Sequence, residues 1–289
     1  MQCPSCQKLG LKIIASSCPH GRNLYQRAEL DSIEIYGHRT RSSIRWVSSG
    51  EYQYQLGHKK FVLQPNRFLV LNDASEYNSL VSIKSKKVKS HTLSFASDFL
   101  ASISADLQRD TITKLDNPKN YGIEAPVLFE NTFQFEGQLG AQLQQLENLG
   151  QQEIQNDEFF YPFAESLIRT QLKVKQQLAG ISTAKKSTKE ELFRRLLLAY
   201  ELIMQDSTAS FSTQELASFA AVSEFHFLRS FKAAFGISPR QLQNQNKMKD
   251  AQRLLDSGHY SASEIAYKTG FNDLSSFSHA FKKWRSKPK

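Results

Sequence analysis

The chain has 289 residues, of which 40% are hydrophobic and 22% charged, and its net charge is +9. This length suits two domains that each bury a core. No apolar run reaches the ~18 residues that a membrane-spanning helix needs, and Lys8 and Lys12 interrupt the apolar patch where a signal peptide would lie. A cytoplasmic protein with no membrane segment is therefore expected.

The N-terminal residues contain all the cysteines of the chain. Cys3, Cys6 and Cys18 are followed by His20, and Cys-x2-Cys with Cys-x-His could close a tetrahedral zinc site. The other interpretation is an N-terminal arm, residues 1–28, whose thiols stay reduced in the cytosol. We expect the arm and no cofactor. Zinc analysis of the purified protein distinguishes the two, since a site requires about one zinc per chain.

Alternating apolar and polar residues follow, separated by turn residues. This pattern predicts strands at 32–36, 44–47, 52–56, 60–63, 68–71, 81–83 and 92–95. Many short strands at close spacing are typical of a small antiparallel β-barrel or sandwich. His38, His58 and His91 stand apart, which argues against the clustered ligands of a metal-dependent enzyme. The predicted β domain, residues 29–180, is therefore interpreted as a binding or dimerisation module.

A small effector is one expected partner of this domain. Aromatic side chains and an amide suit a small, partly apolar ligand. The candidates are Trp46, Tyr52, Tyr54, Asn72 and Tyr77. The alternative for each aromatic residue is a place in the hydrophobic core.

Helical spacing then predicts two amphipathic helices, at about 135–150 and 157–179. Leu139, Leu143 and Leu146 are candidates for the seam of a homodimer, and the alternative is that they pack on their own domain. The polar residues 181–187 are the expected linker. A third helix, about 189–205, precedes the C-terminal part of the chain.

The C-terminal part, residues 188–289, contains one pattern twice. STQELASFAAVSEFHFLRSFK begins at Ser212, and SASEIAYKTGFNDLSSFSHAFK begins at Ser261, 49 residues later. Each copy has a capping-box serine and glutamate, a turn, a second cap, and an i,i+4 phenylalanine pair. This pattern predicts a duplicated helix-turn-helix in which the second helix of each copy exposes a basic face. Between the copies, Ser238-Pro239 opens a long helix to about Ser257.

These residues resemble the DNA-binding domain of the AraC/XylS transcription regulators. The resemblance rests on Ser223, Phe227, Arg229, Phe231, Lys232, Gly236, Ser238, Pro239, Ala251, Leu254, Leu255, Glu264, Ile265, Ala266, Gly270, Phe271, Asp273, Phe277, Phe281 and Lys282. The β domain is more weakly similar to the cupin-like sensor domain of these regulators. The resemblance implies an α+β multidomain protein: a small antiparallel β-barrel with amphipathic helices, then an all-α domain with two helix-turn-helix units joined by a long helix.

Family position implies the DNA-contacting residues of this chain. They are Phe225, Leu228, Arg229 and Lys232 in the first unit, and Leu274, Ser275, His279 and Lys282 in the second. The resemblance implies a dimeric activator, not an enzyme, whose partners are promoter DNA, RNA polymerase and an effector. His279 stands where the family often has arginine, and the family usually continues beyond KKWRSKPK with a further short helix. The alternatives are a sensory or interaction module with degenerate DNA binding, and a zinc-cysteine alkyl-transfer regulator.

Overall fold

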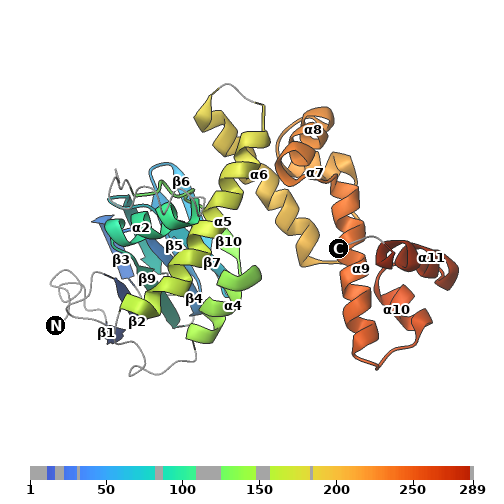
Figure 1. Ribbon diagram of the computed structural model, residues 1–289, viewed down its shortest axis with the longest axis horizontal. Helices are drawn as coiled ribbons and strands as arrows, with labels where there is room; N and C mark the ends of the chain where they lie inside the picture. The colour runs from blue at the N-terminus through green and yellow to red at the C-terminus, as the bar shows by residue number, and fades with distance from the viewer. Residues whose placement is uncertain are drawn as a thin grey trace, which may run out of the picture. The chain divides into compact units, whose positions relative to one another are not determined.

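The computed structural model describes residues 23–30, 33–81, 87–108, 125–147, 157–182 and 185–286, and the backbone of residues 12–16. The chain divides into two compact units, residues 1–174 and 175–289 (Figure 1). Each unit is described by itself.

The strands of the first unit form two antiparallel sheets. Their bounds are β1 Lys12–Ser16, β2 Leu24–Leu30, β3 Ile33–Arg39, β4 Ser43–Ser49, β5 Tyr52–Leu56, β6 Lys59–Leu63, β7 Arg67–Leu71, β8 Glu76–Val81, β9 Val88–Ser94 and β10 Thr132–Gln134. One sheet has the order β1-β2-β9-β4-β7-β10, and the other has the order β3-β8-β5-β6. The predicted antiparallel β region is confirmed. Within the described residues, however, the strands pair as two sheets and not as one closed barrel.

Side-chain alternation explains how these strands bury a core. In β5, Tyr52 and Tyr54 are buried while Gln53 and Gln55 are exposed, because successive side chains point to opposite faces of a sheet. The buried face contributes to a core between the sheets that also includes Val47, Leu63, Leu69, Leu71, Tyr77, Val81 and Val88. Residues 44–47 of β4 are buried on both faces of the strand. β4 therefore lies in the middle of the unit, covered on both sides.

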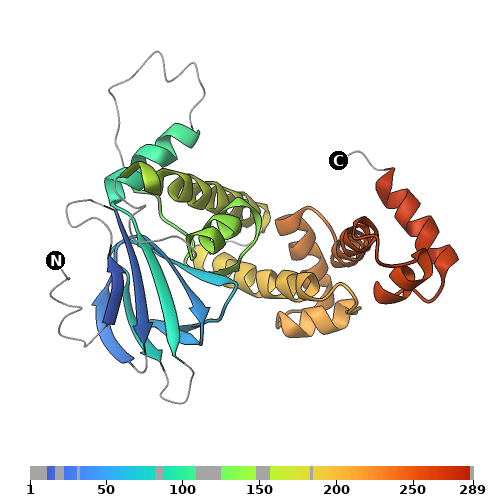
Figure 2. The same cartoon turned by 90° about the horizontal axis from the view of Figure 1, so that it is seen from below.

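The helices of the first unit cover its β region. They are α2 Ser97–Gln108, α4 Gly137–Leu146, the 3-10 helix η2 Asp157–Phe160 and α5 Tyr161–Gly180, of which the residues up to 174 belong to this unit. In both views α4 and α5 lie on the same side of the β region (Figures 1 and 2). The Trp46 indole of β4 donates a hydrogen bond to Glu147, which caps α4, at 3.0 Å. The β4 face opposite the inter-sheet core is thus the face that meets α4.

Part of the range expected as an N-terminal arm belongs to the larger sheet. β2 pairs with β9 from Leu24 to Leu30, and β1 pairs with β2. The sequence LYQRAEL does not predict this strand, and in the structure most of its residues are partly buried on both faces of the sheet. The short strand β10, which pairs with β7, is likewise not among the predicted strands. The predicted cysteine site lies outside the described residues.

The second unit is helical. Its helices are α6 Lys186–Gln205, α7 Thr213–Phe219, α8 Glu224–Phe235, α9 Pro239–Asp256, α10 Ala262–Lys268 and α11 Leu274–Arg285. α7 packs on α8, and α10 packs on α11, while α9 contacts both pairs (Figure 1). The predicted duplicated helix-turn-helix and its connecting helix are confirmed. The predicted domain limits, including the linker at 181–187, stay a prediction. No helix in the described part of the chain is long and apolar enough to cross a membrane.

Candidate DNA-binding interface

The first helix of each helix-turn-helix unit begins with the same capping box. The Ser212 hydroxyl accepts a hydrogen bond from the Glu215 backbone N–H at 3.1 Å, and the Glu215 carboxylate accepts one from the Ser212 N–H at 2.7 Å. Ser261 and Glu264 repeat both contacts, at 3.3 and 2.7 Å. The hydrogen bonds from the serines lower the pKa of both glutamates. Two otherwise unpaired amides are thereby satisfied at the start of α7 and of α10.

The turns of the two units have the same backbone hydrogen bonds. Val222 N–H donates to Ala217 C=O at 3.1 Å in the first turn, and Phe271 N–H donates to Ala266 C=O at 2.9 Å in the second. Each turn needs one residue in the left-handed region. Gly270 takes this position with φ 75°, but in the first turn Ala221 takes it with φ 52°. A side chain with a Cβ is strained in this region, so the first turn costs more to form.

The second helix of each unit begins with a different cap. In α8 the Ser223 hydroxyl accepts from the His226 N–H at 3.4 Å, whereas in α11 the Asp273 carboxylate accepts from the Ser276 N–H at 2.7 Å. The Ser276 hydroxyl also donates to Asp273, at 2.8 Å. These hydrogen bonds lower the pKa of Asp273. The capping hydrogen bond of α11 is therefore shorter and is accepted by a charged group, whereas that of α8 is accepted by a neutral hydroxyl.

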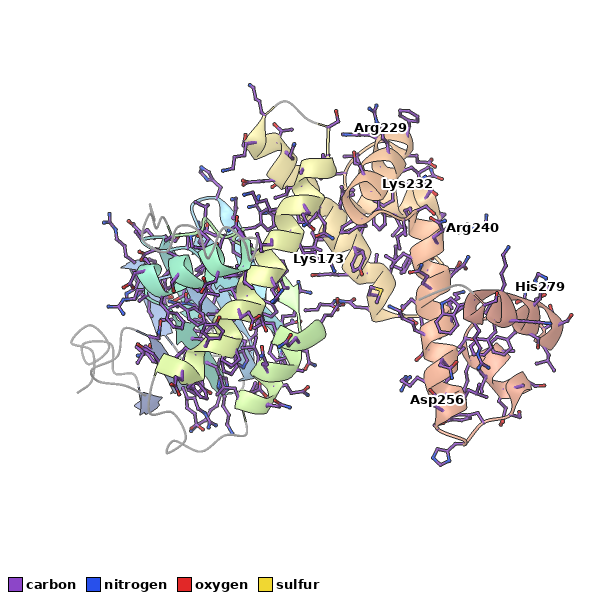
Figure 3. All side chains as sticks on the ribbon, viewed as in Figure 1. Lys173, Arg229, Lys232, Arg240, Asp256 and His279 are labelled. Atoms are coloured by element: carbon purple, nitrogen blue, oxygen red, sulfur yellow. The ribbon has the colours of Figure 1, made fainter. Side chains whose placement is uncertain are left out.

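The predicted DNA-contacting side chains lie on the exposed faces of α8 and α11. On α8, Phe227 and Phe231 are fully buried, while Phe225 is 77% and Leu228 40% exposed. Arg229 and Lys232 are exposed on the same helix, and His279 is exposed on α11 (Figure 3). Leu274, Ser275 and Lys282 are also exposed on α11. α8 thus buries both phenylalanines, α11 buries Phe277 and leaves Phe281 half-buried, and the predicted residues of both helices remain accessible to a partner.

α6 supports the first helix-turn-helix unit, α7 with α8, through a group of aromatic rings. The Tyr200 ring of α6 lies 4.8 Å from the Phe235 ring of α8, and Phe193 lies 6.0 Å from it. Phe231 lies between Phe227 and Phe235, at 5.3 and 4.6 Å. Such packing of aromatic rings fixes the position of α8 within the domain.

α9 holds the segment that leads into α7. The Gln243 side chain accepts from the Phe211 N–H at 2.7 Å and donates to the Phe211 C=O at 3.0 Å. Ser207 donates to Asp250 at 2.7 Å, and Asn246 donates to the Ile203 C=O at 2.9 Å. The further end of α9 packs Ala251 against Ile265, Ala266 and Phe277 of the second unit. α9 therefore connects the two helix-turn-helix units by side-chain contacts as well as by its position in the sequence.

The second helix-turn-helix unit, α10 with α11, has an open apolar groove beside α11. Its volume is about 540 Å³, and it is lined by Leu255, Ala262, Ile265, Phe277, Ser278, Phe281, Lys282, Arg285 and Ser286. Phe281 and Arg285 stand where Phe231 and Phe235 stand in the first unit, at the offset of 50 that follows the turn. The surface that α6 covers in the first helix-turn-helix unit is thus accessible in the second helix-turn-helix unit.

The structure separates the five candidate effector residues. Tyr52, Tyr54 and Tyr77 come together between the sheets, where they surround the buried guanidinium of Arg45. Trp46 lies on the other face of β4, stacked on His91 at 4.9 Å. Among these residues, sequence reasoning missed Arg45. Its signal was an arginine at an inward position of a strand, two residues before the core residue Val47.

Asn72 has a structural contact instead of a place in this cluster. Its side-chain amide donates to the Leu128 C=O at 2.8 Å and accepts from the Leu128 N–H at 2.7 Å. This pair of hydrogen bonds fixes residues 125–131 beside the end of β7. We therefore remove Asn72 and Trp46 from the candidate effector site.

Leu139, Leu143 and Leu146 do not form an exposed seam. They are 3%, 0% and 0% exposed in the single chain, and Gln142 of the same helix donates to the Pro162 C=O of α5 at 3.4 Å. Side chains that are already buried have no surface left for a second chain. The expected dimer seam is corrected accordingly: these leucines belong to the core of their own unit.

Comparisons with known proteins agree with the helix-turn-helix arrangement. Residues 216–288 match the family model described as "Helix-turn-helix domain". "Probable transcriptional regulator LumQ" of Photobacterium leiognathi is 27% identical over 132 residues, which cover 41% of this chain and 53% of LumQ. The match thus spans about half the length of that relative.

Two solved structures are similar to parts of the chain. An apo variant of ToxT from Vibrio cholerae covers 91% of this chain and 94% of its own, at 18% identity and a TM-score of 0.39. The C-terminal domain of AraT from Geobacillus stearothermophilus covers 31% of this chain and 74% of its own, at 31% identity and a TM-score of 0.29.

The capped, duplicated units and the family match define the class of the second unit, which is a helix-turn-helix domain of the kind that transcription regulators use to bind DNA. More specifically, the domain that residues 216–288 form is of the AraC type.

Proposed function

We propose that this protein is a sequence-specific transcription regulator that places α8 and α11 in successive major-groove segments of promoter DNA. The observation that carries this proposal is the duplication itself. Two units with the same capping boxes and the same turn hydrogen bonds present their second helices from one connecting helix, α9. Helices presented in this way read DNA about one helical turn apart.

Arg229 is the proposed main base contact. It is exposed on α8 between Phe225 and Lys232, and a guanidinium can bond guanine O6 and N7 together. Phe225 and Leu228 are exposed apolar side chains that suit the methyl group of thymine. Lys232 is assigned to phosphate, because a lysine ammonium binds a phosphate oxygen as a point charge. Leu274, Ser275, His279 and Lys282 are the proposed contacts of α11.

The same proposal has a part that concerns the first unit, residues 1–174. It includes effector control, homodimerisation and activation through RNA polymerase. A buried, partly polar cluster between two sheets supports effector binding, as described below. Light scattering of the purified full chain tests the dimer, and the buried leucines of α4 are not its proposed interface. In vitro transcription with and without the protein tests the sign of regulation.

DNA selected by the full chain from a randomised library tests the core of this function. We expect the selected DNA to bind at least 1,000-fold more tightly than random DNA, in the range typical of specific complexes. Lys232→Ala should reduce the slope of log K against log salt by about one phosphate contact. Arg195→Ala is the matched control, since Arg195 is a partly exposed residue of α6 paired with Glu191. Equal affinity for selected and random DNA would overturn the proposal in favour of an interaction module.

A further inference from the structure

A buried positive charge lies between the two sheets of the first unit. Arg45 of β4 is 8% exposed. Its Nη1 donates to the Tyr77 hydroxyl at 2.6 Å, its Nη2 donates to the Thr40 hydroxyl at 2.8 Å, and its Nε donates to the Ser43 hydroxyl at 3.4 Å. Its guanidinium also lies 4.5 Å from the centre of the Tyr77 ring and 5.6 Å from that of Tyr54. We call these five residues the Arg45 cluster.

The Arg45 cluster has a full positive charge but no negative one. Every hydrogen-bond acceptor of the guanidinium is a neutral hydroxyl, and no Asp or Glu of the described residues lies within ion-pair distance of it. Burial raises the pKa of Tyr54 and of the neighbouring Tyr52, so these phenols remain protonated at neutral pH. Buried arginines are ordinarily paired with an anion, because the desolvation of an unpaired charge is costly.

The imidazole of His38 is affected by this charge. The His38 ring meets the Tyr77 ring edge-on, with 5.3 Å between their centres. Burial, and then the positive charge of Arg45, lower the pKa of His38. His38 is therefore neutral at neutral pH, and it can serve as a reporter of whether the charge of Arg45 is compensated.

The surroundings restrict the anion that would fit. A guanidinium presents a planar fork of N–H donors that matches the two oxygens of a carboxylate. The core between the sheets consists of tyrosine rings and apolar side chains, among them Val47, Leu69 and Leu71. A single cation in apolar surroundings suits a ligand that has one negative charge and is otherwise apolar. A phosphate, with its charge of roughly −1.5 to −2, would remain partly uncompensated.

We propose that the Arg45 cluster binds the carboxylate of a small, largely apolar organic acid. This proposal rests on the proposed function in one respect, since it assigns a chemical class to the effector of the first unit. The carboxylate replaces the neutral hydroxyl acceptors on one edge of the guanidinium, and charge-assisted hydrogen bonds are roughly twice as strong as neutral ones. The released Tyr77 and Thr40 hydroxyls can then donate to the carboxylate.

Binding to the full chain is the first test. Benzoate and octanoate are the probes, with benzyl alcohol and octanol as neutral partners of the same shape and inorganic phosphate as the other anion. We expect a carboxylate to raise the midpoint of thermal unfolding by several degrees at millimolar concentration, as mass action requires. The alcohols and phosphate should have at most a third of this effect. Equal shifts from acid and alcohol, or a larger shift from phosphate, would overturn the proposal.

Variants of the cluster are the second test. Arg45→Met should weaken carboxylate binding at least 10-fold, and Arg45→Lys should restore part of it, because the charge returns without the fork. Arg39→Met is the control, since Arg39 is an exposed residue of β3 paired with Glu76. Unchanged binding by a folded Arg45→Met variant would show that Arg45 only bridges the sheets.

A measurement on the unmutated chain covers the case in which Arg45→Met does not fold. NMR titration of the His38 ring, assigned by its absence in His38→Gln, should show a pKa that rises when benzoate or octanoate is added, because the bound anion cancels the charge of Arg45. An unmoved His38 with saturating carboxylate refutes the site. DNA binding by the same preparation separates this inference from the proposed function: specific DNA binding without carboxylate binding overturns the site alone.

Discussion

The two helix-turn-helix units have the same local structure but different support. Both have a serine–glutamate capping box and the same turn hydrogen bonds. The second helix of the first unit is then held by the aromatic rings of α6, whereas the equivalent surface of the second unit borders an open groove. At the position of Phe235 the second unit has Arg285. The comparison shows that the repeated residues determine the helices and their turn, while the packing around each second helix decides how firmly it is held.

The largest expected difference concerns the packed phenylalanines. Phe231→Ala should lower the free energy of opening of α8 by about 3–5 kcal/mol, because it removes a fully buried ring from close packing. Phe281→Ala removes a half-buried ring at the edge of the groove, and should lower the opening free energy of α11 by about 1–2 kcal/mol. Amide hydrogen exchange of the two helices in the full chain measures both values. Equal losses would contradict the unequal support of the units.

The next difference concerns DNA. Arg229→Ala should weaken binding to DNA selected by the protein by about 1–3 kcal/mol and relax the preference at one base pair. His279→Ala should cost less, because a single imidazole lacks the two-pronged contact of arginine. Band-shift titrations of the full chain on selected DNA, and on DNA with each base pair changed in turn, measure both effects. The ranking is wrong if the loss at His279 is the larger.

The turns differ in the residue with a positive φ. Gly270→Ala should destabilise the second unit by about 1–2 kcal/mol, since a Cβ in the left-handed region is strained and would lie 3.3 Å from the Lys247 Nζ and the Thr208 C=O. Ala221→Gly should stabilise the first unit, by less than about 1 kcal/mol, because the lost strain is partly offset by backbone entropy. Hydrogen exchange of α7 and α10 compares them. A loss of stability in Ala221→Gly would exclude strain in the first turn.

The sequence was most informative where contacts are local. Capping boxes, the proline that begins α9 and the phenylalanine pairs act within one or two turns of helix, so their spacing alone predicts the second unit correctly. β4–β7 were likewise predicted nearly to the residue, because alternation and turn residues are also local signals.

What the sequence could not provide depends on partners far along the chain. Arg45 reaches Tyr77 across 32 residues, and Trp46 reaches Glu147 across 101. The inward position of Arg45 can be read from its strand, but the partner of neither Arg45 nor Trp46 can, so only the structure separates the candidate tyrosines from Trp46. The three leucines of α4 have the spacing both of a dimer seam and of a core stripe, and only their burial distinguishes these.

The smallest expected difference lies in the caps of α8 and α11. Hydrogen bonds from Ser276 lower the pKa of Asp273 in the folded chain. A lowered folded pKa means that the cap contributes fully above the unfolded value of about 3.9, and that this contribution is lost as the pH falls through the folded value. Ser223 of α8 has no such titration. Hydrogen exchange between about pH 5 and 3 should therefore show α11 losing protection relative to α8. Asp273→Asn keeps a cap without a charge and should abolish the relative loss; its persistence in that variant would assign the pH dependence to another group.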